Sequence, residues 1–155
     1  MKLSRMKTGR LTILLPLLLL TGCTVGVRLY PVQGPLSAQN PLPVFSGKIS
    51  GGLNFDVGTV SLAVDGETFN GRWNRVLPSD VAPTSSMWDA VYGSGYYVSH
   101  VVGDKHYAKA AITGDKGTLL NVEFYQIEAA ENRVHLFGVA SDSKGDIYKI
   151  TFKSA

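Results

Sequence analysis

Apolar and polar positions alternate along most of the chain after residue 44, with the period of two that is typical of strands with one buried face. β-Branched and aromatic residues dominate these segments, and glycine-containing turns separate them. No strand–helix–strand alternation of the kind that builds a parallel sheet is present. The pattern therefore predicts an all-β domain over residues 45–155, an antiparallel meander of hairpins with at most one short helix. It leaves open whether the hairpins form a small sandwich or a barrel.

The first hairpin is predicted to turn at Asp65-Gly66, a pair that is typical of two-residue type I′ turns. This register pairs Val64 with Glu67 and sets Leu62 opposite Phe69 on an apolar face. Trp73 continues that face. Turn chemistry and hydrophobic pattern agree, as they do in a genuine hairpin.

A second hairpin is predicted over residues 96–112, turning at Gly103-Asp104. Its register pairs Val101 with His106, Ser99 with Ala108 and Tyr97 with Ala110. His100 and His106 would then point to opposite faces of the sheet, and they could not bind one metal ion together.

Two further turns are predicted as three-residue loops that end in a left-handed glycine, at Gly117 and Gly145. The first loop brings two apolar sets onto one face: Ala108, Ala110 and Ile112 with Leu120, Val122 and Phe124. The second loop sets small residues against large ones: Ala140 opposite Tyr148, Gly138 opposite Ile150, and Leu136 opposite Phe152.

Residues 78–93 are the least strand-like part of the domain. Ser85 or Ser86 is expected to cap a short helix over residues 87–92 that ends at Gly93 and closes an open barrel end. Nearby aromatic residues form a candidate patch for a ligand or partner: Trp88, Tyr92, Tyr96 and Tyr97. The alternative is that Trp88 and Tyr97 belong to the core and the other two are ordinary strand tyrosines.

Residues 23–44 are rich in proline and glycine and carry few charges. This composition predicts an extended tether that holds the domain away from whatever the N-terminal segment is attached to. The alternative is that residues 28–31 dock on the domain or on a partner, since Leu29 and Tyr30 are costly to leave in water.

The N-terminal segment has basic residues, then an apolar run over residues 11–20 that is too short to span a bilayer. Leu20-Thr21-Gly22-Cys23 resembles the lipobox of bacterial lipoprotein signal peptides. The resemblance implies a signal peptide over residues 1–22, cleavage between Gly22 and Cys23, and lipidation of Cys23. Because Thr24 and not aspartate follows the cysteine, it also implies the periplasmic face of the outer membrane. Residues 138–148 are similar to the C-terminal signature of small bacterial envelope proteins, which implies no activity.

The charge of the chain changes when the signal peptide is removed. Four of the 15 Lys+Arg residues lie in residues 1–22 and none of the 12 Asp+Glu residues does, so 11 basic and 12 acidic residues remain. The basic isoelectric point therefore belongs to the targeting segment, and no nucleic-acid partner is expected. The single cysteine, if lipidated, leaves no disulfide and no thiol chemistry.

No residue pattern in the chain indicates catalysis. The side chains of His100, Asp104 and His106 are separated by the expected hairpin, and His135 reads as a solvent-facing strand residue. Glu123, Glu128 and Glu131 fit a solvated sheet edge. Gly93-Ser94-Gly95 lacks the full pattern of a nucleophilic serine turn. We therefore expect no enzyme, no metal and no cofactor.

Three functions are compatible with the sequence. The first is a lipid-anchored envelope protein with a binding or structural role. It would contact the membrane through the Cys23 lipid and would bind an envelope protein as its partner. The second is a carrier of a small apolar ligand in a barrel interior, which requires a cavity lined by Leu62, Phe69, Trp73 and Val122. The third is a hydrolase, which requires His100 or His106 in a cleft beside a serine or a carboxylate.

Overall fold

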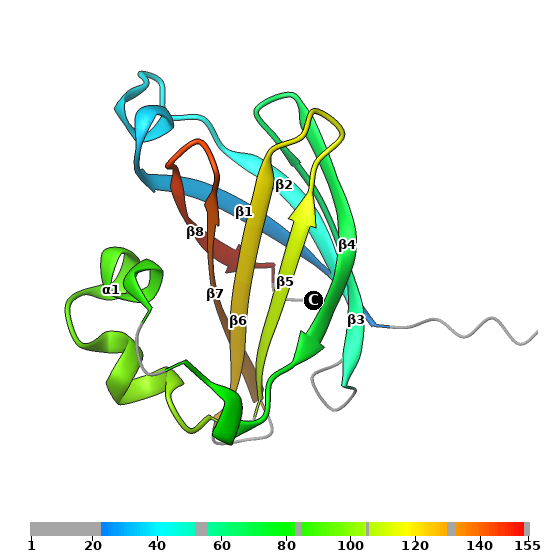
Figure 1. Ribbon diagram of the computed structural model, residues 1–155, viewed down its shortest axis with the longest axis vertical. Coiled ribbons are helices and arrows are strands. Elements are labelled where there is room, and N and C mark those ends of the chain that lie inside the picture. Colours follow the sequence, from blue (N-terminus) through cyan, green and yellow to red (C-terminus); the bar gives the residue numbers. More distant parts are fainter. Residues whose placement is uncertain (1–22, 52–55, 83–84, 105, 130–132, 154–155) are drawn as a thin grey trace, which may run out of the picture.

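The chain folds into a closed barrel of eight antiparallel strands in sequence order (Figure 1). The structure, a computed structural model, describes residues 23–51, 56–82, 85–104, 106–129 and 133–153; the expected signal peptide over residues 1–22 lies outside them. Each strand pairs with the next, and β8 pairs with β1. The all-β prediction is confirmed, and the open choice between sandwich and barrel is settled as a barrel.

The elements follow one another as a simple meander with one helical insertion between β4 and β5. The strands are β1 (Thr24–Gln33), β2 (Phe45–Ser50), β3 (Val57–Val64), β4 (Glu67–Arg75), β5 (Tyr107–Thr113), β6 (Leu119–Ala129), β7 (Arg133–Asp142) and β8 (Ile147–Phe152). The helical elements are η1 (Pro35–Ala38), η2 (Pro78–Asp80), the α-helix α1 (Ser86–Tyr92) and the π-helical turn η3 (Tyr97–Val101).

Three of the predicted hairpins have the expected registers. In the first, Val64 pairs with Glu67 and Leu62 with Phe69. In the others, the backbone φ of Gly117 is +91° and that of Gly145 is +95°, which is the left-handed conformation that the three-residue loops require. The pairs that follow include Ala110 with Val122, Ile112 with Leu120, Ala140 with Tyr148 and Gly138 with Ile150.

The predicted hairpin over residues 96–112 is wrong. Residues 97–101 form η3, and β5 begins at Tyr107, so the expected pairs of Val101 and Ser99 with that strand do not form. Tyr97 and Val101 are both buried, four residues apart, on one side of a helical turn. The inference that His100 and His106 lie on opposite faces of a strand pair falls with the hairpin.

The predicted tether over residues 23–44 is also wrong, because its first half is β1. Val27 and Leu29 point into the barrel and are fully buried, while Arg28 between them is exposed. Pro31 lies beyond the last pair with β2 and beside a register shift in the pairing with β8, where a strand tolerates proline. Further along, Leu36 of η1 is buried as well. The docking alternative was closer to the structure.

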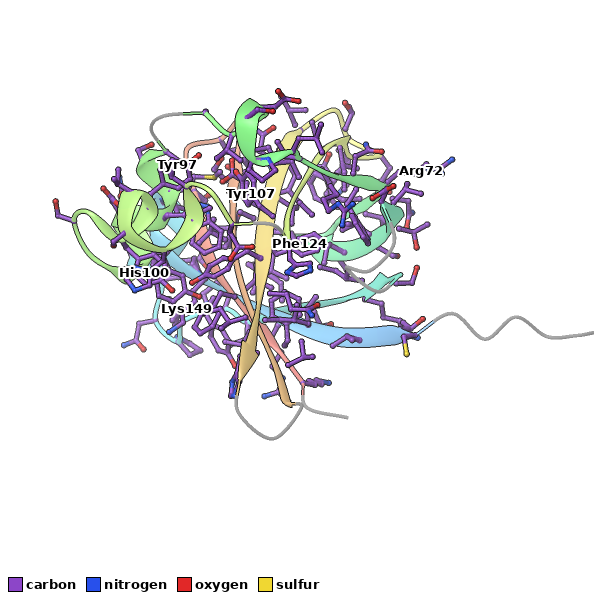
Figure 2. The ribbon with its side chains drawn as sticks, turned by 90° about the horizontal axis from the view of Figure 1, so that it is seen from below. Arg72, Tyr97, His100, Tyr107, Phe124 and Lys149 are labelled. Atoms are coloured by element: carbon purple, nitrogen blue, oxygen red, sulfur yellow. The ribbon has the colours of Figure 1, made fainter. Side chains whose placement is uncertain are left out.

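The short helix is confirmed, but its expected place across a barrel end is wrong. The helical segment, residues 86–101, lies outside the ring of strands (Figure 1). It covers outward-facing residues of β5, β6 and β7 and forms a second core with them: Trp88, Tyr97, Val101, Tyr107, Tyr125 and Val139. Figure 2 shows Phe124 within the ring of strands and Tyr97 and His100 on the helical segment beside it.

Inward-facing glycines make room for the large side chains that fill the barrel. A Cβ on Gly71 would lie 2.7 Å from Ile112 Cγ1, and one on Gly47 would clash with Leu62 Cδ2. The rings of Trp73 and Phe124 meet edge to face, with centroids 5.4 Å apart. Small residues opposite large ones give the interior the close packing of a protein core.

Buried carboxylates join the turns at one end of the barrel. Glu67 accepts hydrogen bonds from the backbone N–H of Lys116 (3.0 Å) and Thr118 (2.9 Å) and from the Thr118 hydroxyl (2.6 Å). Asp146 accepts one from the backbone N–H of Leu36 (2.8 Å). The two carboxylates therefore fix the β5–β6 turn and η1 to neighbouring strands.

The two carboxylates have pKa values shifted in opposite directions. Burial by itself would raise the pKa of Glu67, but the hydrogen bonds from Thr118 and Lys116 together hold it below its usual value. Burial, followed by the charges of Asp142 and Asp65, raises the pKa of Asp146. Glu67 thus stabilises the fold when ionised, whereas Asp146 is better tolerated when protonated.

We predict opposite effects when each carboxylate is replaced by its amide. Glu67→Gln should lower the melting temperature at neutral pH, because an amide nitrogen cannot accept from Thr118. Asp146→Asn should raise it, because the amide oxygen still accepts from Leu36 and the charge repulsion is gone. Thermal unfolding followed by circular dichroism from neutral to acid pH measures both effects.

The pH dependence checks the cause. The stability that Glu67 gives at neutral pH is lost as the pH falls through its lowered pKa, so the deficit of Glu67→Gln should shrink there. The penalty at Asp146 is present above its raised pKa and relieved below it, so the gain of Asp146→Asn should also vanish in acid. Shifts of the same sign at neutral pH would contradict this assignment.

Candidate ligand-binding groove

The barrel has one weakly paired seam, between β4 and β5. Among the described residues of these strands, the ladder joins only Asn74 to Lys109 and Arg75 to Ala108. At the other end, Thr68 and Asp115 exchange hydrogen bonds, the backbone N–H of Asp115 to the Thr68 carbonyl and the Thr68 N–H to the Asp115 carboxylate, each 3.0 Å. The two strands are therefore fastened at both ends and face each other without a ladder in between.

A groove of about 1010 Å³ lies over this seam. The helical segment forms one wall, and the outer faces of β4 to β7 form the rest. Its lining combines polar and apolar surface. The polar residues are Arg72, Asn74, Ser85, Ser86, Asp89, Lys109, Asn121, Glu123 and Ser141, and Met87, Tyr97, Val98 and Ala111 add apolar surface. Ala110 and Val122, whose side chains face the barrel core, also line it. The groove thus reaches into the seam.

An ion pair between a buried carboxylate and a partly exposed lysine lies at the base of the groove. Glu123 is 6% exposed and sits opposite Lys109 in the β5–β6 ladder, with 3.3 Å between Lys109 Nζ and Glu123 Oε1. The indole N–H of Trp88 donates to its other oxygen at 2.7 Å. The expectation of a solvated edge at Glu123 is wrong, because the helical segment covers this part of β6. The side chain of Glu128 and the whole of Glu131 lie outside the described residues.

The Tyr107 hydroxyl is buried near this pair and makes no hydrogen bond to another described residue. Burial, followed by the charge of Glu123, raises the pKa of Tyr107 far above its ordinary value, so the phenol stays protonated. Tyr107 belongs to the second core with Trp88 and Tyr97, and Figure 2 shows it between Tyr97 on the helical segment and Phe124 in the barrel. The polar groups that act on this phenol are those of Glu123 and Tyr97.

Asp89 ties the wall of the groove together. It stands in α1, and its carboxylate accepts hydrogen bonds from the backbone N–H groups of Gly95 (3.1 Å) and Tyr97 (3.0 Å) at the start of η3. The bond from Tyr97 and then that from Gly95 hold the pKa of Asp89 below its usual value. Ser85 occupies the cap position of α1 but makes no side-chain cap bond, so Asp89 fixes the segment instead.

The candidate aromatic patch is packed between the helical segment and the barrel. Trp88, Tyr92 and Tyr96 stack in sequence with His100, the successive ring centroids lying 5.7, 4.6 and 4.3 Å apart. Trp88 and Tyr97 are buried, as the alternative interpretation held, and Tyr97 lies apart from the stack, donating to the Ala82 carbonyl at 2.7 Å. Tyr97 is the one patch residue that also lines the groove.

Two outside contacts hold this stack in place. The hydroxyls of Tyr96 and Tyr125 share a hydrogen bond of 2.6 Å, and Lys149 Nζ lies 5.2 Å from the centroid of the Tyr92 ring. Burial, followed by the proximity of Tyr96, raises the pKa of Tyr92 to about 12. The stack therefore serves to attach the wall of the groove.

The histidines do not form a site. His100 is exposed and bonds with Ser99 and the Tyr96 carbonyl, while His106 and the exposed His135 lie elsewhere. Within the described ranges, no three His, Cys, Asp or Glu side chains gather as metal ligands. Cys23 is exposed, and its carbonyl accepts a hydrogen bond from the Gly51 N–H at 3.0 Å, directly before β1.

Comparisons with models of protein families, with curated proteins and with solved structures found no match to this chain. In the part of the chain that the structure describes, no helix has the length and apolarity needed to cross a bilayer. The interpretation of the groove therefore rests on its own chemistry.

We predict that Asp89→Ala loosens the wall of the groove without unfolding the barrel. The change removes the acceptor for two backbone N–H groups while leaving the barrel ladders intact. Amide hydrogen exchange should become faster at Gly95 and Tyr97 and stay slow in β6. Asp80→Ala, at an exposed aspartate of η2, is the control. Unchanged protection of the Gly95 and Tyr97 amides from exchange would show that Asp89 does not hold the wall of the groove in place.

Proposed function

We propose that this protein is a binding domain whose ligand site is the groove over the β4–β5 seam. The observation that carries the proposal is the contrast between a filled interior and a preformed groove of about 1010 Å³ outside it, lined by both polar and apolar side chains. Ligand sites are concave, largely preformed, and furnished with a few convergent polar groups. The amides of Asn74 and Asn121, the guanidinium of Arg72 and the hydroxyls of Ser85 and Ser86 supply such groups.

The charges of the groove favour a polar ligand with a negatively charged group. Lys109 is partly neutralised by Glu123, and Asp89 is occupied by two backbone N–H groups. Arg72, exposed on β4, has no ion pair among the described residues, and a guanidinium is well suited to hold a carboxylate or a phosphate. The ligand's anionic end is therefore assigned to Arg72.

The barrel interior is a weaker candidate for an apolar ligand. The carrier hypothesis requires a cavity lined by Leu62, Phe69, Trp73 and Val122. All four are at most 2% exposed and belong to one packed cluster. Of the four, only Val122 reaches the groove. Entry of an apolar ligand would require the interior to repack, which is costly in a dense core.

The proposal keeps the lipid anchor at Cys23 and the periplasmic face of the outer membrane as the location. The exposed thiol at the first described position supports it, since a lipid attached there would not collide with the barrel. Because β1 begins at Thr24, such a lipid would hold the barrel directly at the membrane surface. An envelope protein is the second class of partner in this proposal. It would bind the surface of the barrel that faces the periplasm.

We predict that anionic probes bind at Arg72. Nuclear magnetic resonance titration of the isotope-labelled mature domain would compare glucuronate with glucose and phosphoserine with serine. The anionic member of each pair should shift the amide signals of Arg72, Lys109 and Asn121. Arg72→Gln should weaken this binding on the order of tenfold, the usual size of a hydrogen-bonded charge contact.

The matched control is Arg75→Gln, on the same strand. Arg75 is ion-paired with Asp56 at 2.6 Å and does not line the groove, so its loss should leave probe binding unchanged. Shifts centred on Leu62, Phe69 and Trp73 would favour the carrier in the barrel interior. Equal effects of the two arginine variants would contradict the assignment to the groove.

We predict that Cys23→Ser releases the protein from the membrane. Without the thiol no lipid can be attached, so the protein should leave the membrane pellet in fractionated cells, whereas Thr24→Ser should remain in it. Thr24→Asp should move the protein to the inner membrane fraction. Persistence of Cys23→Ser in the membrane pellet would contradict the lipid anchor.

A further inference from the structure

Three cationic side chains lie together on the outer face of the barrel close to Cys23. They are Arg28 on β1, Lys48 on β2 and Lys153 directly after β8, and all three are exposed. We call these three residues the basic patch. No described residue of β1, β2 or β8 lines the groove.

The register of the sheet brings the patch together around Gly26. Lys48 pairs with Gly26 across β1 and β2, and the Lys153 N–H donates to the Gly26 carbonyl at 2.8 Å. The Lys153 stem lies over Gly26, its Cδ 3.1 Å from where a Cβ would stand. Adjacent strands are about 4.8 Å apart, so β2 and the chain at Lys153, on either side of Gly26, are roughly 10 Å from each other. Arg28 follows on the same face of β1.

No carboxylate balances the patch on its own strands. β1, β2 and β8 contain no aspartate or glutamate, and no patch residue forms an ion pair with another described residue. Lys149, the remaining cation of β8, is half-buried and lies over the Tyr92 ring. The outer faces of three adjacent strands therefore present uncompensated positive charge.

We infer that the basic patch lies against anionic phospholipid headgroups and sets the orientation of the barrel on the membrane. The inference rests on the proposed attachment of lipid at Cys23. Gly26 is three residues along an extended strand from Cys23, which is about 10 Å at ~3.3 Å per residue. Charges that close to a bilayer lie within roughly one Debye length of its surface and are attracted by it.

This orientation determines where the groove faces. In a closed ring of eight sequential strands, the β4–β5 seam lies on the side opposite β8 and β1. Docking the patch on headgroups therefore turns the groove away from the membrane, toward the aqueous compartment. The lipid attaches the barrel to the membrane. The basic patch determines which side of the attached barrel faces the aqueous compartment.

The test uses the mature domain, which contains every described strand and helix. Its single thiol allows Cys23 to be coupled to a maleimide lipid in vesicles. Two compositions are compared: phosphatidylcholine alone, and phosphatidylcholine with phosphatidylglycerol in equal parts. A trace of gadolinium-chelating lipid broadens the amide signals of residues close to the headgroups, which reports orientation.

On phosphatidylglycerol vesicles, broadening should be strongest around Gly26 and weakest around Arg72. Lys48→Gln/Lys153→Gln should abolish this asymmetry, with each lysine lost lowering the docked population by roughly fivefold. The matched control Lys116→Gln/Lys144→Gln removes two lysines from the turns at one barrel end. In this control the asymmetric broadening should persist. High salt and pure phosphatidylcholine should also remove the asymmetry.

Broadening that is independent of lipid charge, or equal effects of the two double variants, would overturn the inference. This failure is distinguishable from failure of the lipid anchor, since the coupling is chemical and does not depend on processing in cells. Conversely, Cys23→Ser could remain in the membrane pellet while the chemically coupled domain still shows the asymmetric broadening. That result would support the role of the basic patch and contradict lipidation of Cys23 in cells.

Discussion

The structure depends on the pairing of β1 with both β8 and β2. This strand closes the sheet, and its inward residues Val27 and Leu29 complete the interior core. A closed sheet has no edge strands at which other chains could add. Closure also fixes the ring order, which places the weakly paired seam and β1, with Cys23 directly before it, on opposite sides of the barrel.

The barrel also needs a second layer, because β5, β6 and β7 bury residues on both faces. Their outward residues include Tyr107, Tyr125 and Val139, which would be exposed without the helical segment. The segment in turn has no core of its own; Asp89, the Trp88–Glu123 bond and the aromatic stack attach it. The groove exists because this attached layer stops short of covering the β4–β5 seam.

The hairpins were predictable because their determinants are local. Asp65-Gly66 and the left-handed glycines 117 and 145 set both the turn and the register. By contrast, β1 contains proline, and its partners lie at the far end of the chain. The helical turn at residues 97–101 was missed because β-branched and aromatic residues also suit strands, although rings at positions 88, 92, 96 and 100 repeat with the helical period of about four. The burial of Glu123 depends on that tertiary contact, so the groove could not be derived from the chain alone.

The absence of a spacer between Cys23 and β1 has a mechanical consequence. A lipid pulling on Cys23 would load β1 along its own length. The hydrogen bonds that join β1 to β2 and β8 run perpendicular to the strands. They would therefore share the load in shear instead of breaking one after another, and the barrel would resist unfolding by a force applied at Cys23.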